Sequence, residues 1–412
     1  MTAATSHDGN RRIAVLVGCA AVIAGVVAYL WLRHHTLARL LLALGIGKVP
    51  LHDYQAFFYP MGAKVLSSPQ PIEGFLYSPF AALFFAPFSW LPYHASAWAW
   101  AATLLLLTFL LAWESVRPVR RHAWLVVLIV GIIASAMPVL HNHKFGQVSL
   151  LIVVPILLCV HFYERGRPVL AAACLMFSVA FKFYPAFFLI YFAFRRDWRF
   201  LAAAAGFGLL FLVVIPAIAI GPLDTLAFYQ DVARQIESRF GSQIADKNSQ
   251  SFLSFFQRLL LDKARLDPST WRPVLTVLRY ALCAGLLVVT YRLARSRRPD
   301  ATRWAFLWLL AASPFFVVTS WPHYFAYLPA IVAATLGWVI EARGAPLVRA
   351  LVAAASLGAA ALSSIFVFDL VGNRHVYSWW GYLFFADLLA LLALALALLA
   401  RRREPVDVAQ GA

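Results

Sequence analysis

The residue in this sequence best suited to acid–base chemistry is Asp53, in the segment LHDYQAFFY just beyond the first hydrophobic stretch. A carboxylate beside a dense aromatic face at a membrane surface can act as a general base toward a lipid-bound substrate. A helix N-cap or an ordinary surface charge is the competing explanation, because it accounts for most loop aspartates. We expect residues 49–66 to form a helix on the membrane surface, with Asp53 at the rim of a cavity. The side chains expected to face lipid there are Phe57, Phe58 and Met61.

Two basic side chains could meet a phosphate. Lys182 stands between two apolar stretches, where a charge costs roughly 2.5–3.5 kcal/mol on insertion scales. It can hold a phosphate as a point charge, or its ammonium can extend to the outer interface from a span end, and the sequence favours neither. His323 follows a Trp-Pro pair and could hydrogen-bond a leaving phosphate or orient Asp53, unless it is an ordinary interfacial histidine in an aromatic belt.

Further polar residues are candidates for substrate binding because they fall in segments predicted to share one side of the membrane. Tyr77 precedes a short apolar helix that can persist at membrane depth only if it is shielded or lines a wet cavity. The other candidates are Asn142, Lys144, Gln147, Asn248, Ser249 and Tyr324. His141 and His143 make a weak metal motif, and head-group contacts or an interfacial turn are favoured over a metal there. The segment from Asn248 to Ser251 also has the pattern of a helix cap, which we favour for it.

Composition places these residues in a membrane protein. The chain has 412 residues, 62% of them hydrophobic and 13% charged, and its mean hydropathy is +0.76. A soluble domain of this size could not bury so much apolar surface, so we predict an all-α polytopic membrane protein. The net charge of +17 lies mostly in short loops between apolar runs. It is therefore interpreted as a topology signal and as contact with membrane lipids, and not as nucleic-acid binding.

Apolar runs and their breakers predict about twelve transmembrane helices. The expected spans are 13–32, 94–115, 123–140, 147–163, 168–182, 184–194, 199–220, 273–293, 303–318, 323–340, 347–368 and 379–400. The stretch 80–91 is too short to cross and is expected to be a re-entrant or interfacial helix. The KFYP sequence that begins at Lys182 interrupts one long apolar run, so two broken helices could meet there within the membrane.

Arginine placement supports this map. With twelve spans, every arginine-rich turn falls on one side, which the positive-inside rule makes cytoplasmic, together with both termini. The first loop, 33–79, and a long loop, 222–272, then lie on the opposite, periplasmic side. We expect one transmembrane domain over 1–403, followed by a short disordered tail at 404–412.

Six segments, in order, resemble glycosyltransferase family 87. They are "DYQAFFYPMGAKVL", "FLYSPFAALFFAPFSWLP", "KFGQVSLLIVV", "FKFYPAFFLIYFAFRRDWR", "NSQSF" and "SPFFVVTSWPHYFAYL". The resemblance implies a multi-span GT-C fold and transfer of a hexose, mannose in the characterised mycobacterial members, from a polyprenyl-phosphate sugar. It also implies that Asp53 is the catalytic base, that His323 assists, and that Lys182 is the lysine found before a Tyr-Pro pair in that family.

This resemblance implies an inverting displacement on a glycan or glycolipid acceptor, at the outer face of a bacterial plasma membrane. Asp53 would deprotonate the acceptor hydroxyl, and Lys182 and His323 would meet the charge of the leaving phosphate. No cofactor or divalent metal is expected. The alternative is a transporter or flippase of lipid-linked saccharides, but the sequence has no matching halves of the kind that transporters carry.

Overall fold

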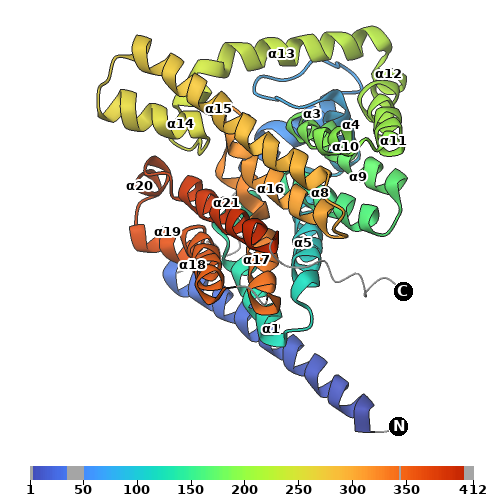
Figure 1. Ribbon diagram of the computed structural model, residues 1–412. Helices are drawn as coiled ribbons and strands as arrows, with labels where there is room; N and C mark the ends of the chain where they lie inside the picture. Colours follow the sequence, from blue (N-terminus) through green and yellow to red (C-terminus); the bar gives the residue numbers. More distant parts are fainter. Residues whose placement is uncertain (1–2, 35–50, 343–344, 403–412) are drawn as a thin grey trace.

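The computed structural model describes residues 3–34, 51–342 and 345–402, which fold almost entirely into helices (Figure 1). The N-terminal half forms α1 (Ala3–His34), η1 (Tyr54–Phe58), α3 (Tyr59–Lys64), α4 (Pro79–Ser89), α5 (Tyr93–Val116), η2 (Arg117–Val119), α6 (Ala123–Ser135), α7 (Met137–Phe145), α8 (Ser149–Glu164), α9 (Pro168–Phe181), η3 (Tyr184–Phe188) and α10 (Leu189–Arg195). The remainder forms α11 (Trp198–Leu209), η4 (Leu210–Val214), α12 (Ile215–Ile220), α13 (Pro222–Ala245), α14 (Phe252–Phe256), η5 (Gln257–Lys263), α15 (Pro268–Ala294), α16 (Ala301–Phe316), η6 (Pro322–Tyr327), α17 (Leu328–Glu341), α18 (Pro346–Leu362), α19 (Ile365–Val371), α20 (Arg374–Trp379) and α21 (Tyr382–Arg401).

Each of the twelve predicted spans coincides with a helix or with a run of consecutive helices. Within the described ranges, six helices are long and apolar enough to cross a membrane: Arg12–Arg33, Tyr93–Val119, Trp198–Ile220, Ser269–Ala294, Pro322–Glu341 and Tyr382–Arg401. Six shorter apolar helices accompany them: Pro79–Ser89, Ala123–Ser135, Ser149–Glu164, Pro168–Phe181, Tyr184–Arg195 and Pro346–Leu362. The chain is therefore an all-α polytopic membrane protein, whereas the count of twelve spans and the GT-C architecture stay predictions.

Two of the predicted spans are broken where they meet. The span expected over 123–140 ends at Ser135, and the span expected over 347–368 ends at Leu362. Between them, Ala136 and Ser364 form an isolated antiparallel bridge. Each break has a local cause, since α7 begins with a proline in its first turn and the Ser364 side chain caps α19.

The long segment 222–272 is not an open loop. It contains α13, a 24-residue helix that lies across one end of the molecule (Figure 1), followed by α14, η5 and the start of α15. The side chain of Phe228 is fully buried and packs edge-to-face on Phe75 at 6.2 Å. The side-chain oxygen of Gln235 accepts a hydrogen bond from the backbone nitrogen of Gly74 at 2.8 Å. These contacts hold the extended segment that leads into Tyr77.

Several of the arginine-rich turns lie together at one end of the bundle. Ion pairs connect them to each other: Arg303 with Glu164 at 2.5 Å, His161 with Glu114 at 2.8 Å, and Arg401 with Asp300 at 2.5 Å. Each pair joins turns or helix ends that the sequence assigns to the cytoplasm. The positive-inside rule, and not the structure, makes that end cytoplasmic.

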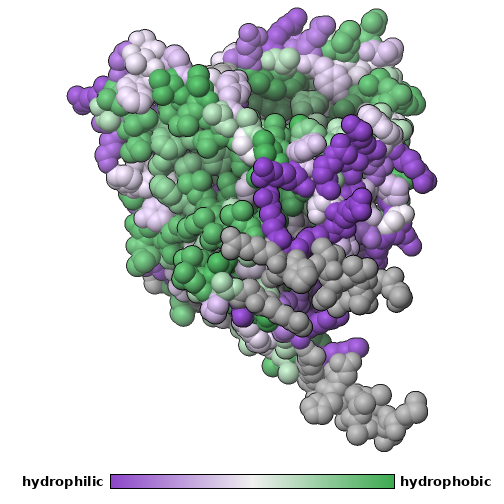
Figure 2. All heavy atoms as spheres, viewed as in Figure 1, coloured by the Kyte–Doolittle hydropathy of each residue, from purple (hydrophilic) through white to green (hydrophobic). Residues whose placement is uncertain are grey.

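The outer surface of the bundle is apolar over a broad area. In Figure 2 hydrophobic side chains cover much of the left of the view, whereas hydrophilic ones gather along the top edge and at the right. Large apolar side chains that are exposed include Trp124 (62%), Leu223 (81%) and Leu370 (85%). Such a surface is what a lipid-facing exterior requires. The residues 35–50 of the expected first loop and the expected tail at 404–412 lie outside the described part.

Candidate active site

Asp53 stands directly before η1, which is anchored in the protein core by its aromatic side chains. Tyr54 is fully buried, its ring stacks on Trp100 at 5.8 Å, and its hydroxyl hydrogen-bonds the Ser96 hydroxyl at 2.5 Å. Phe58, one turn further on, packs on Phe85 at 4.8 Å. Asp53 makes no capping hydrogen bond to this helix, so its carboxylate is available to other side chains.

This anchoring corrects the expected position of the 49–66 helix. Phe58 and Met61, expected to face lipid, are both fully buried, and only Phe57 is partly exposed. The cause is α4, which packs closely against α3 at Gly62. A Cβ at Gly62 would lie 2.5 Å from the carbonyl oxygen of Phe85, so only glycine permits this approach.

The end of α7 brings Gln147 to Asp53. Gly146 ends this helix in the left-handed region, with φ of 66°, and its carbonyl oxygen accepts a hydrogen bond from Trp100 Nε1 at 2.9 Å. A Cβ at Gly146 would lie 2.7 Å from the Cβ of Leu51, so the Gly146 backbone packs directly against the Leu51 side chain. The side-chain nitrogen of Gln147 donates to Asp53 Oδ2, while its oxygen accepts from the Tyr77 hydroxyl at 3.2 Å.

Ser78 brings Tyr77 and Lys182 together. Its side chain caps α4, accepting from Ala81 N at 3.2 Å, and its hydroxyl donates to the carbonyl oxygen of Ala180, two residues before Lys182. The Lys182 ammonium lies 4.9 Å from the centre of the Tyr77 ring. Burial, as the largest cause, raises the pKa of Tyr77 well above its ordinary value, so this hydroxyl stays protonated and donates to Gln147.

Lys182 continues the cluster toward the late histidine. Its ammonium donates to the hydroxyl of Tyr324 and lies 4.2 Å from the centre of that ring. The neighbouring His323 is 4% exposed and stacks on His141, with ring centres 5.4 Å apart. Nε2 of His323 is buried without a hydrogen-bond partner in the described part of the chain, which leaves a polar atom for a bound group.

The contacts close into a ring of side chains. His141 stacks on Phe145 at 4.3 Å, Phe145 lies 6.0 Å from the ring of His52, and Nδ1 of His52 lies 2.9 Å from Asp53 Oδ1. The structure thus brings together six of the ten residues singled out from the sequence. They are Asp53, Tyr77, Gln147, Lys182, His323 and Tyr324.

The other four candidates differ from one another in burial and in their contacts. Asn142 is fully buried beside His141, and neither polar atom of its side chain has a hydrogen-bond partner among the described residues. Lys144 is exposed, with its ammonium 5.9 Å from the Phe145 ring centre. The side chain of Asn248 donates to Asp246 at 3.0 Å. The expected role of these three residues in substrate binding stays a prediction.

Ser249 belongs to a short segment that holds η6. The backbone nitrogen of Ser320 donates to its hydroxyl at 3.2 Å, and Gln250 N donates to the Ser320 carbonyl at 2.6 Å. The Ser251 hydroxyl donates to the Val318 carbonyl at 2.6 Å and also caps α14. The cap expected at the end of this segment is confirmed. Through these bonds the segment fixes the residues that lead into His323.

Sequence reasoning missed three side chains in or beside the cluster. The sequence favours head-group contacts or an interfacial turn for His141, yet the structure stacks its ring on that of His323. His52 was not selected, although it adjoins Asp53. Tyr184 stacks on Tyr324 at 5.8 Å. The proline at the start of α7 was the available signal, because it marks a new helix that carries His141 toward η6. Nothing local marks the other two.

A metal site is not evident in the part of the chain that is described. Across 3–34, 51–342 and 345–402, no group of three or more His, Cys, Asp or Glu side chains could hold a metal ion. The expectation that no divalent metal takes part stays a prediction, to be tested by chelation.

Comparison with known proteins supports the resemblance seen in the sequence. The family model described as "Glycosyltransferase family 87" matches residues 75–320, more than half of the chain. The chain belongs to glycosyltransferase family 87. The family 87 match begins after Asp53 and ends just before His323, so the placement of these two beside the matched residues comes from the structure.

Two relatives of this family 87 chain carry the same printed name, polyprenol-phosphate-mannose-dependent alpha-(1-2)-phosphatidylinositol mannoside mannosyltransferase. The one from Mycobacterium tuberculosis is 34% identical over an alignment covering 34% of this chain and 39% of the relative. The one from Mycolicibacterium smegmatis is 27% identical over 69% of this chain and 65% of the relative. The chain thus matches less than two thirds of the length of either relative. No solved structure gives a significant match.

Proposed function

We propose that this protein is a membrane glycosyltransferase that moves a hexose from a polyprenyl-phosphate sugar to a glycan or glycolipid acceptor at the outer face of a bacterial plasma membrane. The observation that carries the proposal is the single connected cluster in which Asp53 and Lys182 lie on either side of Tyr77 and Gln147. A carboxylate and a cation within one cluster support the proposal, because transfer from a phosphate ester needs a base and a group that meets the charge of the phosphate. The names of the two relatives favour mannose as the sugar.

The base would be Asp53. In an inverting displacement, its carboxylate accepts the proton of the acceptor hydroxyl while that oxygen forms a bond to the anomeric carbon. The side-chain nitrogen of Gln147 donates a hydrogen bond to Oδ2 of Asp53, and Nδ1 of His52 contacts Oδ1. The carboxylate is thus held in one orientation, with its side chain still 17% exposed, and a positioned base contributes about 10²–10⁴-fold to the rate.

The leaving group would be met at the other end of the cluster. As the bond from the anomeric carbon to the phosphate oxygen breaks, its electron pair stays on that oxygen, and the phosphate gains negative charge. The Lys182 ammonium and an N–H of His323 are the donors that would meet this charge. The rings of Tyr77 and Tyr324 lie close to the ammonium, and a cation is attracted to an aromatic face.

The test is transfer by purified protein from a panel of radiolabelled polyprenyl-phosphate sugars, with phosphatidylinositol mannoside as the first acceptor. We expect labelled product from one sugar, mannose first, and a loss of about 10²–10⁴-fold in Asp53→Asn. Asp224→Asn, which removes an exposed carboxylate on α13, is the matched control and should leave turnover unchanged. Because acidic residues are sparse, 18 in 412, turnover should also persist in EDTA.

Two outcomes would count against the proposal. Turnover of Asp53→Asn at the wild-type rate would remove this residue from the mechanism. Movement of intact labelled donor across a vesicle membrane, without any transferred product, would instead support the flippase alternative.

A further inference from the structure

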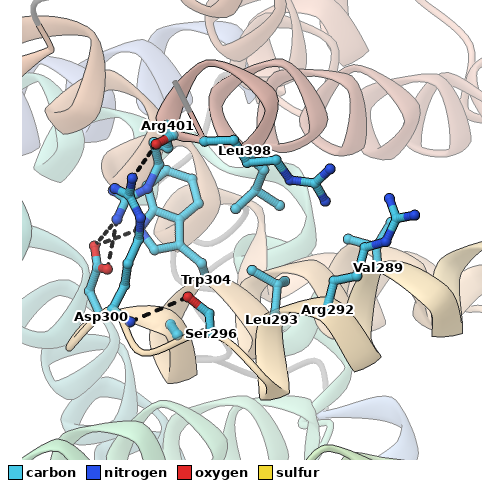
Figure 3. Close-up of a pocket in the computed structure, with 11 residues that line it drawn as sticks. Val289, Arg292, Leu293, Ser296, Asp300, Trp304, Leu398 and Arg401 are labelled. Carbon is cyan, nitrogen blue, oxygen red and sulfur yellow. Dashed lines mark hydrogen bonds and ion pairs between the residues drawn. The ribbon is translucent and has the colours of Figure 1, made fainter. Parts of the chain in front are cut away.

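A cavity with several arginines in its lining lies at the opposite, arginine-rich end of the bundle from the candidate active site. It measures about 270 Å³ and is formed where α15 and α21 end and α16 begins (Figure 3). Part of its lining is apolar and consists of Val289, Leu293 and Leu398. The rest is dominated by arginine. The cavity has room for several water molecules, and so for a phosphate ester.

One side of the cavity is built around Asp300. Its carboxylate pairs with Arg401 at 2.5 Å and accepts a hydrogen bond from Trp304 Nε1 at 3.0 Å, and the Arg401 guanidinium lies 4.6 Å over the Trp304 ring. The Arg298 guanidinium donates to the carbonyl oxygen of Arg401. Figure 3 shows Asp300, Trp304 and Arg401 together at one side of the cavity. The acid of the lining is therefore already neutralised.

The other two arginines of the lining, Arg292 and Arg402, carry charge that no described residue balances. Arg292 and Arg402 are exposed, and neither makes a hydrogen bond or ion pair with another described residue. Arginines near helix C-termini interact favourably with the helix dipole, which accounts for their presence there. The helix dipole does not account for a cavity that combines the charges of Arg292 and Arg402 with an apolar wall.

The chemistry of this cavity matches an anionic phospholipid. The guanidinium groups suit a phosphodiester, and the apolar wall continues onto exposed apolar side chains, Val288 (50%) and Leu399 (56%), along which acyl chains can lie. Basic pockets between transmembrane helices on the cytoplasmic side are known to bind such head groups. We propose that this cavity binds the head group of an anionic phospholipid of the surrounding membrane.

The test is lipid binding to the purified full-length protein, measured by native mass spectrometry in detergent with phosphatidylglycerol or phosphatidylcholine added. Each arginine near an anionic lipid surface changes binding roughly five-fold, so Arg292→Gln combined with Arg402→Gln should weaken phosphatidylglycerol binding about 30-fold. The matched control is Arg295→Gln with Arg297→Gln. It removes the same charge from the same end, at exposed positions outside the cavity lining, and should bind as wild type does.

A second variant separates the cavity from charge alone. Leu398→Trp leaves every charge in place and fills the apolar part of the cavity, so it should also release the bound lipid. Equal loss of binding in both arginine pairs, or retention of lipid by Leu398→Trp, would overturn the proposal. So would stabilisation of the protein by inorganic phosphate that equals stabilisation by phosphatidylglycerol. Because binding and not transfer is measured, the result is independent of the proposed function.

Discussion

Gln147 donates its side-chain amide to the carboxylate of Asp53, a residue 94 positions earlier in the chain. The same amide accepts a hydrogen bond from the hydroxyl of Tyr77 at 3.2 Å. Because a carboxylate can only accept, Asp53 fixes which way the amide points, with the nitrogen toward Asp53 and the oxygen toward the Tyr77 hydroxyl. Gln147 therefore orients the proposed base without itself being able to exchange a proton.

Replacing Gln147 by leucine should lower turnover by roughly 10–100-fold, because the loss of one buried hydrogen bond costs about 1–3 kcal/mol of positioning. The effect should fall on kcat more than on the KM for donor, since Gln147 contacts the base and not the cation. Gln55→Leu, an exposed glutamine on η1, is the control. Unchanged kcat in Gln147→Leu would show that Asp53 does not need this partner.

Gly146→Ala should destabilise the protein and reduce transfer. A side chain in the left-handed region costs about 1–3 kcal/mol, and here the new Cβ would also meet Leu51 at 2.7 Å and Tyr54 at 2.8 Å. Gly166→Ala is a matched control, since its φ of 69° is similar but nothing lies within 4 Å. Thermal unfolding in detergent should show the larger decrease for Gly146→Ala. Equal decreases would mean that the close approach costs nothing.

Lys182→Met should reduce transfer by about 10²–10³-fold, as removal of a group that stabilises developing charge usually does. The control is Lys263→Met, which removes another lysine held over an aromatic ring, that of Trp380 at 3.8 Å, and should keep its turnover. If both variants kept full activity, the leaving phosphate would have to be met elsewhere.

His143 predicts a pH dependence of stability. Burial lowers its pKa to about 4, whereas an unfolded histidine has a pKa of about 6.5. Between pH 6.5 and pH 4 this histidine binds a proton in the unfolded chain but stays neutral in the folded chain. The free energy of unfolding should therefore decrease as pH falls from about 6.5 to about 4, by about 3 kcal/mol in total. Denaturant unfolding at several pH values should show this loss. The loss of stability at low pH should be smaller in His143→Gln and unchanged in His375→Gln, which replaces an exposed histidine.

The sequence predicted the helices better than their breaks. Apolar runs locate each span because lipid and protein interior both require continuous apolar helices. The same reason explains the error at Phe58 and Met61, whose side chains suit either environment. Only the packing of α4 onto α3 decides between them, and that contact is not encoded in local spacing.

Several residues of the candidate site could be predicted from the sequence, but their contacts with one another could not. The outward segments supplied Asp53, Lys182 and His323, and the structure brings them together. The contact between His141 and His323 depends on the break after Ser135, which turns α7 toward η6. The supporting role of Ser249 likewise depends on hydrogen bonds to Ser320, and no pattern within either segment predicts that pairing.

Exposure decreases across the cluster. The side chains of His52 and Asp53 are 70% and 17% exposed, whereas Tyr77 and His323 as whole residues are only 6% and 4% exposed. Asp53 therefore lies nearer to water than Tyr77 and His323 do. For the proposed reaction this gives the two substrates separate entrances. The hydroxyl arrives from the aqueous side, and the isoprenoid carrier can remain in the hydrocarbon, so neither substrate blocks the path of the other.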